Sequence, residues 1–308
     1  MSYNIMDSGF ADQSGKYDPV GDRVPGNLTN FVASFSSFVD VLGVVETGAW
    51  SAKGSAKHPG YNDIAASWGF AHVHVRGNCA IMAHKPLHIL EEPSEGDSTI
   101  VAMVDNVTYI VTSMSSLSYA KKVDDFRKLG GLVNRYSSSA LLLMGDLNTL
   151  SPQDAPRYNA SLLCGNGTYD AAQQTGEYVE NYCLPPASDD EATTSNWVLD
   201  YPLRGLLETT DLTDLCYLSG GFYDIDTDQP QKYSQCGFSN PTLLIHMTGA
   251  YGFKRGSHGH DHATAKIDYI LANKRMLRSH RFHHTTVLSS FQADGASDHY
   301  PIEATFLV

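Results

Sequence analysis

The sequence carries little positive charge and no long hydrophobic run. Its 308 residues include 21 Lys and Arg against 34 Asp and Glu, which gives a formal net charge of −13. A negative protein attracts a phosphate backbone poorly, and no stripe of basic residues with interleaved aromatics is visible. No stretch approaches the run of about 18 apolar residues that a membrane span needs. These absences argue against a long nucleic-acid duplex as the binding partner and against a transmembrane helix in the chain.

Cysteine is scarce, and its spacing excludes one kind of site. The chain has five cysteines and no Cys-x-x-Cys pair, so a structural zinc site is not expected. Cys79 lies in an apolar segment typical of a buried free thiol. The other four lie in loop-like sequence rich in Gly, Ser and Asn, where they could form two disulfides.

Glycosylation sequons favour a secreted protein. Four Asn-x-Ser/Thr sequons begin at Asn27, Asn106, Asn159 and Asn166. No signal peptide is visible, because the first predicted strand begins almost at Met1. We therefore expect an extracellular or secretory-pathway protein whose leader was removed.

Apolar periodicity predicts helices and strands along most of the chain. Residues 27–38 repeat apolar positions at the spacing of a helix face, and residues 119–135 also look helical. Continuous apolar runs at 39–45 and 140–144 are typical of buried strands. Further strands are expected at 2–6, 71–75, 79–83, 89–91, 98–104, 107–113, 267–272, 285–288 and 302–306, and further helices at 60–67, 203–207 and 212–217.

Two long irregular stretches interrupt this pattern, near 149–200 and 220–262. Stretches of that length without regular structure are usually functional loops. We find no internal repeat and no clear linker, so the sequence predicts one domain spanning residues 1–308. Strands both begin and end the chain, which suits two packed sheets with helices outside.

Polar residues follow or end several of the predicted strands. Asn4 lies in the first strand, Glu46 follows Val44-Val45, and Met-Gly-Asp-Leu-Asn at 144–148 follows an apolar run. Ser-Asp-His at 297–299 precedes the last strand. Each residue alone has an ordinary explanation, such as a solvated glutamate, a satisfied core amide or an Asp/Asn turn. Together they supply the oxygen ligands that Mg²⁺ prefers.

Taken in this order, these segments resemble the endonuclease/exonuclease/phosphatase superfamily of deoxyribonuclease I-like hydrolases. The resemblance covers essentially the whole chain and implies an α/β fold, a four-layer α/β/β/α sandwich of two packed mixed sheets flanked by helices. It implies a divalent metal, Mg²⁺ first, Mn²⁺ next and Zn²⁺ last. The expected metal ligands are Glu46, Asn4 and Asp298.

The resemblance also implies catalytic roles. Asp146 would orient or deprotonate the attacking water, and Asn148 would hold a phosphate oxygen, since residues two apart share one side of an extended segment. His299 would donate to a phosphate oxygen. Asp268, in an Ile-Asp-Tyr strand, would orient a second catalytic histidine. Asn78 matches a position that supports the active-site histidine.

One position departs from the family pattern. Met114 falls where members usually carry the second histidine, and a thioether cannot donate a proton. Three interpretations follow: the leaving group takes its proton from Tyr119 or from a water on the metal, a histidine of another loop substitutes, or the protein is a poor hydrolase with a binding role.

A histidine-rich tract is the candidate for that substitution. His258, His260 and His262 lie shortly before Asp268 and could also bind zinc or another soft metal. A solvated Gly/His loop is an equally good interpretation. Lys254, Arg255 and Lys266 flank the tract. The expected substrate contacts are Lys254, Arg255 and His260, together with Asn78.

The sequence thus predicts a divalent-metal-dependent phosphoesterase, acting on diesters of nucleic acid, nucleotide, phospholipid head group or inositol phosphate. One alternative is a catalytically impaired member that binds a phosphorylated ligand or a protein. Another is a metalloenzyme of different chemistry in the same cleft. The acidic charge disfavours nucleic acid as partner, contact with a membrane surface stays open, and we expect a monomer.

Overall fold

The computed structural model of the chain describes residues 1–5, 27–48, 50, 60–91, 98–114, 119–157, 183–184, 198–199, 201–219, 222–224, 229–231, 266–288 and 299–307. Side chains are described throughout these ranges, except at 27, at 119–120, at 156–157 and in the short strands between 183 and 199 and between 222 and 231.

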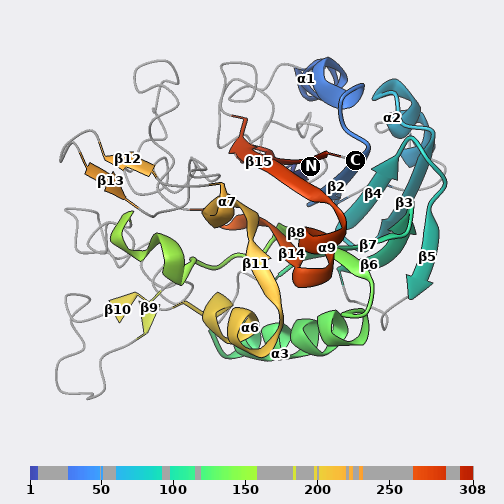
Figure 1. The fold of residues 1–308 in the computed structure, drawn as a ribbon. Helices are drawn as coiled ribbons and strands as arrows, with labels where there is room; N and C mark the ends of the chain where they lie inside the picture. The colour runs from blue at the N-terminus through green and yellow to red at the C-terminus, as the bar shows by residue number, and fades with distance from the viewer. Residues whose placement is uncertain are drawn as a thin grey trace, which may run out of the picture.

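The first large sheet joins the two ends of the described chain. Its strand order is β15–β16–β1–β2–β4–β3 (Figure 1). The strands are β1 Ser2–Asn4, β2 Val41–Val45, β3 His72–Arg76, β4 Cys79–Ala83, β15 Arg281–Val287 and β16 Ile302–Leu307. β1 runs parallel to β2 and antiparallel to β16, so the first and last of these strands are neighbours.

The second large sheet has the order β11–β14–β8–β7–β6–β5. Its strands are β5 His88–Glu91, β6 Thr99–Val104, β7 Val107–Ser113, β8 Ala140–Asp146, β11 Leu212–Asp214 and β14 Asp268–Asn273. β7 and β8 pair in parallel and are connected through α3, Tyr119–Arg135, since parallel neighbours need a crossover. Both sheets are therefore mixed.

Alternating side chains on β8 show how the layers are built. Leu141 and Leu143 belong to an apolar cluster with the α3 residues Phe126 and Leu129, on the outer face of the second sheet. Leu142 and Met144 point the other way, into the cluster between the sheets. The sheets approach closely there, because a Cβ on Gly43 would lie 2.6 Å from the Met144 sulfur.

Helices cover the outer face of each sheet. α1 (Asn27–Ser36) and α2 (Tyr61–Ser67) lie with the first sheet, and α6 (Leu203–Thr209) packs beside α3 on the second (Figure 1). This arrangement confirms the predicted α/β/β/α sandwich. No helix in the described ranges is both long and apolar enough to cross a membrane.

Two predicted elements are corrected. Residues 212–217 are not one helix, because Leu212–Asp214 pairs with β14 and only Leu215–Leu218 forms a helix, α7. Asp214 divides the two, since its side chain accepts a hydrogen bond from Cys216 N as the α7 cap. The strand expected at 285–288 begins earlier, at Arg281, after an unpredicted helix, α9 Lys274–Ser279.

The two irregular stretches lie mostly outside the described residues. Within them the structure places a 3₁₀ helix, η1 Pro152–Arg157, and two small hairpins. The hairpins pair β9 Cys183–Leu184 with β10 Val198–Leu199, and β12 Phe222–Asp224 with β13 Gln229–Gln231. Cys79 is a buried free thiol, as predicted.

Candidate active site

Strand pairing in the first sheet brings Asn4 and Glu46 to the same edge. β1 and β2 run parallel with Asn4 opposite Val45, so Glu46 follows directly beside the amide. Glu46 is half-buried and has a positive φ of 60°. A non-glycine residue in that region costs on the order of 1–3 kcal/mol, and such strain concentrates at functional sites.

Strand pairing in the second sheet brings Asp146 and Asp268 to the same edge of that sheet. β8 and β14 are antiparallel with Asp146 opposite Asp268 at their ends. His299 lies just before β16, the neighbour of β1, and is 5% exposed. One ligand atom from each of Asp146, Asp268 and His299 falls within 4.8 Å of the others.

The amide of Asn4 connects the two sheets. Asn4 is fully buried, and its Nδ2 donates to Glu46 Oε1 and to Asp146 Oδ2, both at 3.0 Å. The third contact, to His299 Nε2, is longer at 3.5 Å. The two hydrogens of the amide match the two short contacts. Asn4 therefore holds two carboxylates at a fixed separation and presents them beside the imidazole.

His299 and Asp268 form a buried dyad. His299 Nδ1 lies 2.7 Å from Asp268 Oδ2. An ionised carboxylate only accepts hydrogen bonds, so Nδ1 carries the proton, and Nε2 faces Asn4 and the other acidic residues. The resemblance implied that Asp268 orients a second histidine. The structure instead places it against His299, so this aspartate needs no further histidine as its partner.

Met114 does not present its thioether to this cluster. Its side chain is 8% exposed and packs in the apolar cluster under α3. Its backbone is what reaches the site, because its N–H donates to Asp146 O at 2.9 Å and its carbonyl accepts from Asn148 Nδ2 at 3.0 Å. Met114 thus helps to fix the turn that follows β8.

The turn after β8 has a conformation that the extended-strand argument missed. Asn148 has a φ of 47° and donates its backbone N–H to Asp146 Oδ1 at 2.8 Å. The segment is therefore curled rather than extended, and the Asn148 amide points at Met114. Gly145 is required, because its φ is 143° and a Cβ there would lie 1.8 Å from Thr112 O.

Electrostatics single out Asp146. Burial and then the charges of Asp268 and Glu46 raise its pKa, His299 and the Asn148 N–H lower it, and the net result is a pKa of about 8. A carboxylate under this strain is stabilised by a nearby cation. Oxygen ligands from Glu46, Asp146 and the Asn4 amide fit a hard divalent ion, so the donor set suits the implied metal.

Lys122 is a residue of this region that the sequence analysis missed. It projects from α3, is fully buried, and donates from Nζ to the Asn148 carbonyl. Burial lowers its pKa to about 8, although Asp146 raises it. In the sequence, Lys122 is one lysine in an amphipathic helix, and nothing in the pattern predicts its buried contact. Only the fold shows what its side chain contacts.

Asn78 lies near the other end of the cluster. It is exposed, and its backbone carbonyl accepts from Thr47 N at 3.1 Å, directly after Glu46. It thus adjoins the glutamate rather than the histidine it was expected to support. Asp298, Lys254, Arg255 and His260 lie outside the described residues, so their roles stay predictions.

Comparisons with known proteins find the same architecture. An AP endonuclease from Archaeoglobus fulgidus superposes with a TM-score of 0.57 at 16% identity, covering 93% of this chain and 97% of that one. The chain has the endonuclease/exonuclease/phosphatase fold. A family protein of that description from Leptotrichia buccalis covers 100% of this chain and 99% of its own at a TM-score of 0.53 and 13% identity.

A third structure agrees, the 3'-5' exonuclease NExo from Neisseria meningitidis. It has a TM-score of 0.52 at 16% identity, with 91% of this chain and 96% of that one covered. A scan against protein-family models and a search of curated proteins find no match. The endonuclease/exonuclease/phosphatase fold is thus established by structure alone.

Proposed function

We propose that the protein is a divalent-metal-dependent phosphoesterase that hydrolyses phosphodiester bonds. The observation that carries the proposal is the meeting of Asn4, Glu46, Asp146 and the Asp268–His299 dyad at one buried point between two sheets. Buried acidic groups are costly unless they are paired or hold a metal, so such a cluster is a strong candidate for catalysis. Proteins of the same fold include enzymes described as endonuclease and exonuclease.

The metal would be held from the Glu46 side. Glu46 and Asp146 supply carboxylate oxygens, Asn4 holds both in place, and Asp298 is the further ligand that the sequence predicts. A bound divalent cation neutralises phosphate charge and polarises the phosphorus–oxygen bond. Mg²⁺ fits this oxygen-rich set best, and Mn²⁺ follows.

The side chains divide the remaining work. Asp146 orients the attacking water and accepts its proton. Asp268 holds the proton on His299 Nδ1 and fixes the ring so that Nε2 faces the substrate; Nε2 donates to a non-bridging phosphate oxygen when the imidazole is protonated on both nitrogens. Asn148 shapes the turn that carries Asp146, because its own amide is directed at the Met114 carbonyl.

The alternative of a catalytically impaired protein rested on Met114. The contact between Asp268 and His299 weakens that alternative, since the dyad forms without a histidine at position 114. The second alternative, a different metal chemistry using the 258–262 histidines, concerns residues outside the described ranges. Metal content separates it from the proposal.

Charge narrows the substrate that we propose. With a net charge of −13 the protein gains little from non-specific attraction to a long duplex. A small or extracellular phosphodiester is therefore the favoured substrate class. Proteins with one fold can act on many different substrates, so the substrate must be inferred from the site and not from the fold.

Turnover of a generic phosphodiester tests the proposal. Bis-p-nitrophenyl phosphate and p-nitrophenyl phosphate are assayed with EDTA, Mg²⁺, Mn²⁺ or Zn²⁺, for wild type, Asp146→Asn and the exposed control Asp63→Asn. We expect metal-dependent hydrolysis, diester over monoester, that Asp146→Asn abolishes and Asp63→Asn retains. A folded wild type that turns over neither ester with any metal would contradict the proposal and favour a binding protein.

A further inference from the structure

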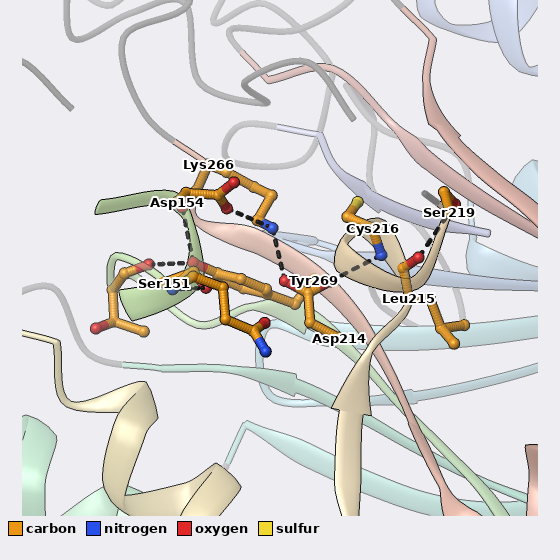
Figure 2. Close-up of polar contacts among 10 residues, drawn as sticks. Ser151, Asp154, Asp214, Leu215, Cys216, Ser219, Lys266 and Tyr269 are labelled. Carbon is orange, nitrogen blue, oxygen red and sulfur yellow. Dashed lines mark hydrogen bonds and ion pairs between the residues drawn. The ribbon is translucent and has the colours of Figure 1, made fainter. Parts of the chain in front are cut away.

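A buried ion triad, defined by Asp154, Lys266 and Asp214, lies next to the site. Lys266 Nζ is 2.7 Å from Asp154 Oδ2 and 2.6 Å from Asp214 Oδ2 (Figure 2). All three side chains are 0% exposed. They come from η1, from the residue range just before β14, and from the end of β11.

Stability alone does not account for this arrangement. Two carboxyl groups flank one ammonium in the interior. Replacing a buried ion network by apolar residues of similar volume is often neutral or stabilising. Ion pairs are directional, so each contact fixes the position of one segment of the chain relative to another.

The charge on Lys266 is maintained by its neighbours. Burial on its own lowers the pKa of this lysine, but Asp214 and then Asp154 raise it above its usual value. Burial also raises the pKa of Asp214, and Lys266 opposes that effect. The ammonium thus remains the centre of the triad.

The contacts of the triad lead into the site along two paths. Along the first, Lys266 is followed by Ile267, whose carbonyl accepts from Leu147 N at 2.9 Å, and then by Asp268 of the dyad. This path ties the residue after Asp146 to the residue before Asp268.

The second path runs through Tyr269, whose side chain lies under Lys266. The Tyr269 hydroxyl lies 2.9 Å from both Thr149 O and Lys266 O. The Lys266 ammonium is 5.1 Å from the centre of the Tyr269 ring (Figure 2). Asp154 N donates to Ser151 O at 3.1 Å, so η1 is held to the segment that leaves Asn148.

We propose that Lys266, clamped between Asp154 and Asp214, is a positioning residue that sets the Asp146–Asn148 turn relative to the Asp268–His299 dyad. The inference rests on the proposed function for its catalytic consequence. Lys266 reaches the site through Ile267 and Tyr269, which adjoin Asp268 in sequence. A misplacement of about 1 Å at a catalytic group can cost 10²-fold in rate, so a small loosening of the triad is expected to be visible in kcat.

Asp154→Asn is the first test, because it keeps the shape and removes one charge. Asp105→Asn, on the exposed turn between β6 and β7, is the matched control. We expect Asp154→Asn to lower kcat about 10-fold with KM unchanged, while the unfolding temperature falls by less than about 4 °C. Asp105→Asn leaves both unchanged.

A second readout does not depend on turnover. The Nδ1 proton of His299, hydrogen-bonded to Asp268, should give a downfield NMR resonance that is assigned by its loss in His299→Gln. In Asp154→Asn we expect this resonance to shift or to exchange faster with water. A merely structural triad would leave the resonance of a folded variant unchanged.

A charge-balanced variant, with Lys266→Met, Asp154→Leu and Asp214→Asn together, guards against loss of folding in the single variant. Asn at 214 keeps the acceptor that caps α7. Wild-type kcat and an unchanged His299 resonance in either folded variant would overturn the inference. If the wild type itself shows no turnover, the proposed function fails, and the resonance still decides whether the triad positions the dyad.

Discussion

Replacing Asp268 by asparagine tests the dyad most sharply. The carboxylate accepts the Nδ1 proton of His299 at 2.7 Å, and both side chains are nearly fully buried. An amide can present either oxygen or nitrogen to Nδ1. It therefore no longer selects the tautomer that leaves Nε2 directed at the substrate.

The contact sets the expected size of the effect. A hydrogen bond to a buried charged group is worth about 1.5–3 kcal/mol, and each 1.4 kcal/mol is tenfold in rate. If that energy acts in the transition state, Asp268→Asn lowers kcat by roughly 10- to 100-fold. KM is expected to change little, since the aspartate does not touch the substrate.

Steady-state kinetics on a phosphodiester, with Mg²⁺ and across pH, provides the assay. Asp63→Asn, an exposed position on α2, is the matched control and is expected to retain wild-type rates. A folded Asp268→Asn protein with unchanged kcat and an unchanged pH profile would refute the reasoning. His299 would then act without help from Asp268.

Three further predictions follow from the same cluster. Glu46→Gln is expected to weaken Mn²⁺ binding by about 10- to 100-fold in calorimetry, because a charged ligand is lost. Asn148→Ala is expected to be about 1 kcal/mol less stable to urea than Asn148→Gly, because φ at 148 is +47°. In EDTA, wild-type stability should fall between pH 4 and about 8 relative to Asp146→Asn, since the folded protein keeps the Asp146 proton that the unfolded chain has lost.

Each of these three predictions would be contradicted by a different result. Equal Mn²⁺ affinity in Glu46→Gln would remove Glu46 from the ligand set. Equal stability of the two Asn148 variants would show that the backbone there carries no strain. If Asp146→Asn changed the stability of the protein by the same amount at every pH, the Asp146 carboxyl would not have a raised pKa in the folded protein.

Much of the fold was predictable because its signals are local. The apolar runs before Glu46 and Asp146 fix two buried strands, and the helical spacing of residues 27–38 and 119–135 fixes the helices that cover them. Residues 212–217 were misassigned because a short apolar stretch fits either a strand or a helix. Only pairing with β14 and the Asp214 cap decide between them.

Parts of the site could not be predicted from pattern. Asp146 and Asn148 look like two residues on one side of a strand, but the positive φ of Asn148 turns the second amide toward Met114. The partner of Asp268 depends on which strand lies beside β14 and β1, which is tertiary information. Lys122 and Lys266 look like ordinary surface lysines in sequence and are fully buried in the fold.

Locating a bound metal tests the central claim directly. Crystals grown with Mn²⁺ are examined for an anomalous scattering peak, in wild type and in Glu46→Gln. The account predicts one strong peak within coordination distance of Glu46 and Asp146, which weakens in the variant. A peak elsewhere, such as at the 258–262 histidines, or none at saturating Mn²⁺, would contradict the claim that this cluster is a divalent-metal phosphoesterase centre.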